Sequence, residues 1–180
     1  ELNMPLFSDY ALKMRTVWVP SGKTVIYDAE KEFDFPVGTI ISKTFHYQKA
    51  AGWSQAEYKV VRADRESRLD DNRRLDLEDY VLIETRLLVR YEDGWQAFPY
   101  VWNGAQTEAW LEIAGDVKNM SLVDADGELN FLYIVPDANQ CSGCHAPNHT
   151  NAEIQPIGLK ARQLNRRYDF GEIRANQIEH

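Results

Sequence analysis

Two Asp-Gly turns, each lying between apolar runs, constrain the fold of this chain more than any other feature. Asp93-Gly94 separates residues 80–91 (YVLIETRLLVRY) from residues 95–103 (WQAFPYVWN), and Asp126-Gly127 lies within residues 122–135 (LVDADGELNFLYIV). Asp-Gly favours the tight turn that joins antiparallel strands, and β-branched and aromatic residues favour the strands themselves. The sequence therefore predicts two β-hairpins and an antiparallel sheet.

Other stretches of the first half share this strand-forming composition: 12–19, 24–28, 38–47 and 57–63. The first two flank the turn Pro20-Ser21-Gly22-Lys23, so we expect them to pair with each other. Residues 105–114 fit a short helix or a strand equally well. The charged stretch 62–74 indicates a solvated loop or an exposed helix.

The composition changes after Pro136. Residues 156–167 (PIGLKARQLNRR) contain helix formers and few β-branched residues, which favours helical or irregular structure. We therefore predict a single domain over residues 1–180 of the mainly β (α+β) class. Its antiparallel β body covers 1–136, and a helical or irregular C-terminal segment covers 137–180.

The charge of the chain excludes some partners. Its 20 basic and 28 acidic residues give a net charge of −8, which repels phosphate backbones, so we expect no nucleic acid partner. No apolar run reaches the roughly 18–20 residues that a membrane helix needs. With 44% hydrophobic residues, the composition is that of a globular domain.

Cys141-Ser142-Gly143-Cys144-His145 is the motif that carries chemistry. The spacing C-x-x-C-H is that of covalent haem attachment: both thiols form thioethers with the haem vinyl groups, and the histidine is the proximal iron ligand. The small residues Ser142 and Gly143 allow a tight turn beside the porphyrin. The motif predicts one haem c held by Cys141, Cys144 and His145.

The cysteines allow two other interpretations, a zinc site and a thioredoxin-like dithiol. A zinc module would need about four ligands, which requires both His145 and His149, since no second C-x-x-C is present. A thioredoxin-like dithiol would need a βαβ unit, which the β-rich sequence does not predict. Covalent haem is the better interpretation. It implies a periplasmic or otherwise exported bacterial protein, because this attachment occurs outside the cytoplasm.

The motif lies late in the chain, and no methionine follows it. A sixth iron ligand would come from one of several residues: His149, His180, Met14, His46, Met120 or Lys43. His149 is only four residues from His145, so it cannot easily reach the other haem face. Met120 is a distal candidate, although its position also suits the core of a strand. The remaining alternative is a five-coordinate iron with an open position.

A β body that ends in C-x-x-C-H resembles the cytochrome P-four-sixty and cytochrome c′-beta family. Residues 35–43 (FPVGTIISK) are similar to that family's strand F-x-x-G-T-[VI]-[LI]-x-K, and Asp93-Gly94-Trp95 is weakly similar to a Gly-Trp pair there. The resemblance implies a P-four-sixty-like fold with Lys43 at the position of a lysine that cross-links to haem. It also implies oxidation of hydroxylamine, or binding of nitric oxide or carbon monoxide at an open iron.

The chain also resembles, along nearly its whole length, a family of exported bacterial mono-haem proteins. The matching segments are 6–23, 35–45, 84–109 and 156–165. This resemblance implies the haem and the fold without implying a reaction.

Alternation along the strand separates two faces near Lys43. Ile41, Lys43 and Phe45 share one face, and His46 belongs to the other. A strand lysine faces solvent by default, and this is the first interpretation of Lys43. Its apolar neighbours on the same face support the alternatives, a place in the haem pocket or a cross-link to the haem. We expect His46 to be exposed or structural rather than a ligand.

Further pocket residues follow from charge. Arg162, Arg166 and Arg167 are candidates to pair with the haem propionates, or they form a solvated face. A distal carboxylate would be one of Glu84, Glu108 and Glu112, and the sequence does not choose among them.

The sequence thus predicts a mono-haem c-type cytochrome with a redox or electron-transfer role. The alternatives are oxidation of hydroxylamine or a related small nitrogen species, binding of nitric oxide or carbon monoxide, and a zinc module without haem. The partner is accordingly a redox protein, a small substrate or a gas, and the protein is a possible haem-dependent oxidoreductase.

Overall fold

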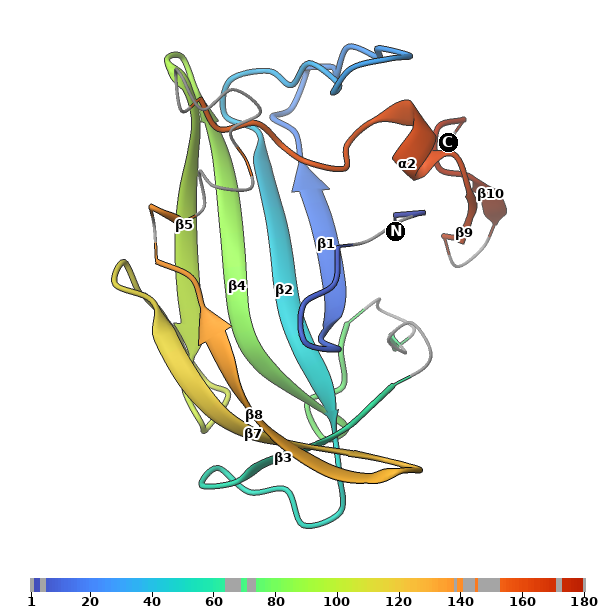
Figure 1. The fold of residues 1–180 in the computed structure, drawn as a ribbon. Helices are drawn as coiled ribbons and strands as arrows, with labels where there is room; N and C mark the ends of the chain where they lie inside the picture. The colour runs from blue at the N-terminus through green and yellow to red at the C-terminus, as the bar shows by residue number, and fades with distance from the viewer. Residues whose placement is uncertain are drawn as a thin grey trace.

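A computed structural model describes residues 2–3, 6–63, 69–70, 74–137, 139–140, 145, 153–170 and 173–179. In this part of the chain eight strands form one sheet, with a short C-terminal segment beside it (Figure 1). The structure is therefore mainly β, as predicted. In the part of the chain that the structure describes, no helix is long and apolar enough to cross a membrane.

The sheet has the strand order β6-β5-β4-β2-β3-β7-β8, and β1 also pairs with β2. Neighbouring strands are antiparallel except β3 and β7, which are parallel. The strands are β1 (Leu12–Trp18), β2 (Ile40–Lys49), β3 (Tyr58–Val61), β4 (Tyr80–Tyr91), β5 (Gly94–Trp102), β6 (Ala109–Leu111), β7 (Asp116–Asp124) and β8 (Gly127–Val135).

Both predicted hairpins are confirmed. In the first, β4 and β5 pair from Glu84↔Val101 to Tyr91↔Gly94, and in the second, β7 and β8 pair up to Asp124↔Gly127. Gly94 and Gly127 have φ angles of 137° and 135°, in the region where a side chain is strained and glycine is not. The glycine of each Asp-Gly pair therefore provides the tight connection.

The predicted pairing of residues 12–19 with 24–28 is wrong. Strand β1 instead pairs along its whole length with β2, from Leu12↔His46 to Trp18↔Ile40. Residues 24–28 contribute only the isolated bridge Ile26↔Asp34. The Asp28 carboxylate accepts the backbone N–H groups of Glu30 and Lys31 at 2.8 Å, so the chain turns here instead of extending.

The ambiguous segment 105–114 contains the short strand β6 and no helix. Of the charged stretch 62–74, the described residues include the bridge Leu69↔Leu75 rather than a helix. Strand β6 lies at one edge of the sheet.

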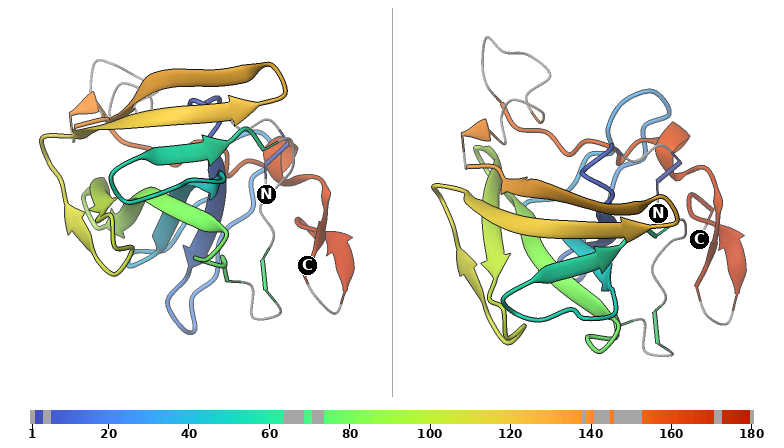
Figure 2. Two further views of the ribbon diagram at one scale, coloured as in Figure 1. Left: turned by 90° about the horizontal axis from the view of Figure 1, so that it is seen from below. Right: turned by 60° about the horizontal axis from the view of Figure 1, so that its bottom comes forward.

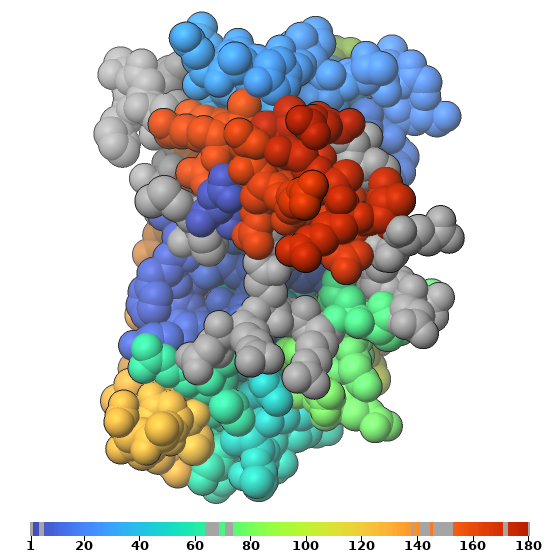
Figure 3. Space-filling model, turned by 90° about the vertical axis from the view of Figure 1, so that its right-hand side faces the viewer, coloured from blue at the N-terminus to red at the C-terminus, as the bar shows by residue number. Residues whose placement is uncertain are grey.

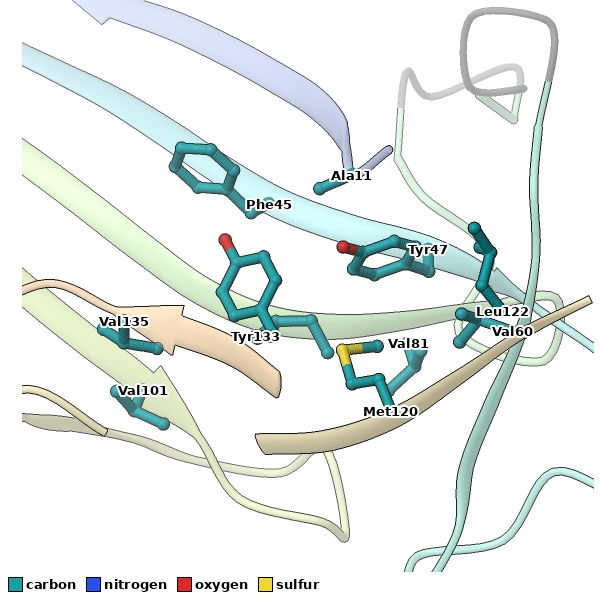
Figure 4. Packing of buried hydrophobic residues seen from close by; sticks show 11 residues of the cluster. Ala11, Phe45, Tyr47, Val60, Val81, Val101, Met120, Leu122, Tyr133 and Val135 are labelled. Carbon is teal, nitrogen blue, oxygen red and sulfur yellow. The ribbon is translucent and has the colours of Figure 1, made fainter. Parts of the chain in front are cut away.

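The sheet bends back on itself, so that β3, β7 and β8 lie across β2 and β4 (Figure 2). Side chains from the two parts meet in one hydrophobic core, drawn in Figure 4. Tyr47 and Tyr133 are each 1% exposed and form an edge-to-face pair with ring centroids 6.1 Å apart. A register shift in β2 between Phe45 and His46 accompanies the bend.

The described part of the C-terminal segment is mostly irregular, which is one of the two predicted alternatives. Its described helix, α2 (Ala161–Leu164), has four residues and ends at Asn165, whose ψ of 75° is not helical. A small hairpin of β9 (Arg167–Asp169) and β10 (Arg174–Asn176) follows. Figure 3 shows this segment spread over one face of the molecule, with N-terminal residues beside it. The segment therefore serves as a cover rather than as a helical subdomain.

Candidate functional site

A cavity of about 410 Å³ lies between the sheet and the segments that cover it. Side chains of β1, β2, β4 and β5 form its floor, and residues 156–159, His145 and the N-terminal residues form the rest. A volume of this size suits a small organic ligand or cofactor. The described lining residues are Leu2, Leu6, Phe7, Ser8, Lys13, Arg15, Val17, Ile41, Ser42, Lys43, Phe45, Arg86, Leu87, Leu88, Ala97, Phe98, Pro99, Pro136, Gln140, His145, Pro156, Ile157, Gly158, Leu159 and Gln163.

Lys43 lies in this cavity and not on the outer surface of the sheet. Ile41, Lys43 and Phe45 all line it, so the predicted grouping of these residues on one face is confirmed. Burial first, and then the charges of the neighbouring Arg86 and Arg15, lower the pKa of Lys43 to about 8, while the charge of Glu84 opposes them. Lys43 is therefore closer to losing its proton at neutral pH than an ordinary lysine.

Strand register places Lys43 in the middle of a row of three cations. Arg15 of β1 is paired with Lys43 of β2, and Lys43 is paired with Arg86 of β4. Lys13 lies two register pairs away, opposite Phe45, and burial followed by repulsion from Arg15 and Arg86 lowers its pKa to about 8. The cavity floor is thus strongly basic in a protein whose net charge is −8.

Three of these cations lie near the aromatic ring of Phe45. Lys43 Nζ lies 5.2 Å from the ring centroid, Lys13 Nζ 5.8 Å and the guanidinium carbon of Arg86 4.5 Å. Phe45 is 1% exposed. The negative face of an aromatic ring attracts cations within about 6 Å, so Phe45 partly offsets the repulsion among them.

Arg86 connects the cavity to a carboxylate inside the core. Its Nε and Nη2 donate to the two carboxylate oxygens of Glu84 at 2.7 and 2.6 Å. The Tyr133 hydroxyl donates to Glu84 Oε1 at 2.6 Å. Glu84 is 0% exposed, and burial together with the Glu84 charge raises the pKa of Tyr133 strongly. Because a buried charge needs such partners, these three bonds fix the Arg86 guanidinium at the cavity floor.

Glu84 is therefore the buried member of the three acidic candidates. Glu108 is exposed, and Glu112 is half-buried with its Oε1 accepting the N–H of Ala114 at 3.2 Å. Glu84 itself is not among the lining residues and acts on the cavity through Arg86.

His145 is the described member of the C-x-x-C-H motif, and it lines the cavity. Its Nδ1 lies 2.7 Å from the Gln155 carbonyl oxygen, and the Gln155 N–H donates to the His145 carbonyl at 2.8 Å. Burial lowers the pKa of His145; the Gln155 carbonyl opposes this, and the charges of Lys43 and Arg86 reinforce it. A neutral imidazole whose Nδ1–H is donated to a carbonyl presents its Nε2 lone pair, which is the arrangement of a metal-ligating histidine.

The other motif residues, Cys141 and Cys144, and also His149, lie outside the described residues. Where the structure describes the chain, no group of three His, Cys, Asp or Glu residues could hold a metal ion. Among the described lining residues, the nitrogen groups able to bind a metal are the imidazole of His145 and the amines of Lys13 and Lys43.

Arg162 and Arg166 do not line the cavity. Arg162 is exposed, and Arg166 Nη1 donates to the Leu2 carbonyl at 3.3 Å. The described arginines that line the cavity are Arg15 and Arg86. The alternation of residues along 12–18 and 80–91 places Arg15 and Arg86 on the inward faces of their strands. It does not show which strands lie side by side, so it does not predict that the two side chains meet.

Met120 and His46 are buried elsewhere. Met120 is 3% exposed and packs in the core beside Val81 and Tyr47 (Figure 4), so the structure does not bring it to His145. His46 is 0% exposed. Of the two predicted alternatives for His46, exposed or structural, the structural one therefore applies. Burial lowers its pKa to about 4, and its ring packs edge-on against Tyr80 at 5.5 Å.

Comparisons with protein-family models, curated proteins and solved structures found no match to this chain.

Proposed function

We propose that this protein is a mono-haem c-type cytochrome whose haem occupies the cavity between the sheet and the C-terminal segment. The observation that carries the proposal is the position of His145. It is the last residue of the C-x-x-C-H motif, it lines the cavity, and Gln155 orients its ring with Nε2 available. Cys141 and Cys144 would attach the haem, and His145 would be the proximal ligand.

The residues of the cavity suit this cofactor. Aliphatic and aromatic side chains would pack against the porphyrin, and Arg15, Lys43 and Arg86 supply positive charge in a site that a dianionic cofactor would enter. When bound, a haem supplies a one-electron redox centre and an axial position for ligands. The protein residues hold the cofactor, keep His145 neutral and exclude water from part of the site.

A redox or electron-transfer role is the first candidate function. A partner protein would accept or deliver the electron, and a haem-dependent oxidoreductase activity would use the same centre. Because covalent attachment takes place outside the cytoplasm, we propose a periplasmic or otherwise exported location.

The composition of the cavity wall supports a second candidate. The described lining contains no methionine, no cysteine and no histidine other than His145. Among the described lining residues, the amines of Lys43 and Lys13 are then the candidates for a second iron ligand, and an iron that binds neither would keep an open position. The second proposal is therefore a P-four-sixty-like scaffold that oxidises hydroxylamine or a related small nitrogen species, or binds nitric oxide or carbon monoxide.

The first experiment tests for covalent haem. The protein is exported together with a c-type maturation system, and its pyridine haemochrome and metal content are measured. We expect one haem per chain, lost in Cys141→Ser/Cys144→Ser and kept in the control Ser142→Ala. A colourless protein with one tightly bound zinc would refute the proposal.

The second experiment separates the two candidate functions. A spectrum of the reduced protein is recorded with and without carbon monoxide. A low-spin, six-coordinate spectrum and no hydroxylamine turnover support electron transfer, whereas immediate carbon monoxide uptake by a high-spin form supports the open iron. If Lys43 is cross-linked to the haem, Lys43→Ala removes a red-shifted ferrous Soret band; an unchanged spectrum in this variant excludes the cross-link.

A further inference from the structure

Positive charge is concentrated on the floor of the cavity. Four basic side chains line it, Lys13, Arg15, Lys43 and Arg86, and no acidic side chain is among the described lining residues. The buried carboxylate of Glu84 is already bonded to Arg86 and to Tyr133.

Lys43 is the member of the row with a vacant donor. Among the described residues, its ammonium group makes no hydrogen bond or ion pair, and its one recorded contact is with the face of Phe45 at 5.2 Å. It is nonetheless largely buried, between two arginines in the same register row. A desolvated cation between like charges is unfavourable unless an anion joins it.

The two arginines give the row its chemical selectivity. A guanidinium presents a planar fork of N–H donors that fits two oxygens of one anion, and an ammonium adds a strong point charge. Arg86 is held rigidly by its bidentate bond to Glu84, so its position does not depend on the ligand. Apolar neighbours such as Leu88 and Pro99 limit the space beside the row.

We propose that the row Arg15–Lys43–Arg86 binds a small oxyanion inside the cavity and so selects an anionic substrate or ligand for the cofactor site. This proposal deepens the proposed function and rests on it for the place of the anion beside a haem. Anion binding by the row itself requires only the described side chains.

Nitrite is a suitable probe, titrated into the oxidised protein at about pH 7 and followed by the haem absorbance. The test variants are Lys43→Met and Arg15→Gln; Arg86 is kept because it also partners Glu84. The control is Lys23→Met, which removes the same charge from an exposed turn. The affinity of the reduced protein for carbon monoxide, a neutral ligand, shows whether the haem site is intact.

We expect each row variant to raise the dissociation constant of nitrite about 10- to 100-fold, the effect of losing one charged hydrogen bond. Lys23→Met should change it by less than about twofold, and the carbon monoxide affinity of Arg15→Gln should stay within about threefold of the wild-type value. Equal nitrite affinities in the wild type and both row variants would overturn the proposal and assign the row to the haem carboxylates. An equal loss in Lys23→Met would also overturn it, because the effect would then be one of net charge.

Failure of the proposed function is recognised separately, by the absence of haem from the purified protein. If the purified protein carries no haem, nitrite binding is measured by calorimetry on the chain as purified. Binding that Lys43→Met abolishes would still support the row, and the absence of binding to the wild type would refute it.

Discussion

Replacing Tyr133 by phenylalanine tests whether Glu84 is a buried charged group that fixes Arg86 at the cavity floor. The substitution removes one hydroxyl and with it the 2.6 Å bond to Glu84 Oε1, while the ring keeps its place in the core. A hydrogen bond to a charged group contributes about 1.5–3 kcal/mol, so we expect a loss of about 2 kcal/mol in the free energy of unfolding. For a chain of this size that lowers Tm by about 4–8 °C.

Tyr47 provides a matched control. It is as deeply buried as Tyr133, but its hydroxyl donates to a neutral acceptor, the backbone carbonyl of Asp9, at 2.6 Å. Tyr47→Phe should therefore cost only about 1 kcal/mol. Urea denaturation followed by fluorescence gives both values.

A double-mutant cycle isolates the charge. In a Glu84→Gln background the acceptor for Tyr133 is neutral, so the loss from Tyr133→Phe should fall to about 1 kcal/mol. Equal losses from Tyr133→Phe and Tyr47→Phe, together with no change in the Glu84→Gln background, would refute the charged network.

Two further substitutions test the cavity floor and a turn of the sheet. In a chloride buffer at about pH 7, Lys43→Met should stabilise the protein by up to about 3 kcal/mol, because the fall of the Lys43 pKa from 10.5 to about 8 opposes folding of the charged form. This advantage is full below pH 8 and should shrink as the pH rises from about 8 to 10.5, whereas Lys23→Met should show no such trend in pH-dependent urea denaturation. Gly115→Ala should cost about 2 kcal/mol or more, since Gly115 has a φ of 79° and a Cβ there would lie 2.6 Å from the Val135 carbonyl oxygen. Gly104→Ala has no such obstacle and should change the urea midpoint little; similar midpoints for both glycine variants would contradict the strain argument.

The hairpins could be predicted from the sequence because their signals are local. The run 80–91 became β4 with the same limits, since Asp93-Gly94 fixes where the chain turns. The partner of β1 could not be predicted in this way. Its pairing with β2 joins residues separated by more than twenty positions, and nothing between Trp18 and Ile40 specifies that register.

The same distinction applies to the cavity. Alternation along β2 was enough to place Lys43 with Ile41 and Phe45, because that pattern belongs to one strand. The cation row depends on three strands lying in register. The sequence does not show the order of strands in the sheet, so the positions of Arg15 and Arg86 beside Lys43 could not be predicted from it. The prediction for Arg162 relied on charge alone, which does not show whether a side chain faces a cavity.

The mass of the intact protein, purified after export with a c-type maturation system and denatured to remove non-covalent ligands, tests the central claim most directly. The account predicts that the wild-type chain is heavier than its sequence by one haem, and that Cys141→Ser/Cys144→Ser returns it to the sequence mass. A wild-type chain at its sequence mass, with both thiols free to alkylate, would contradict the account.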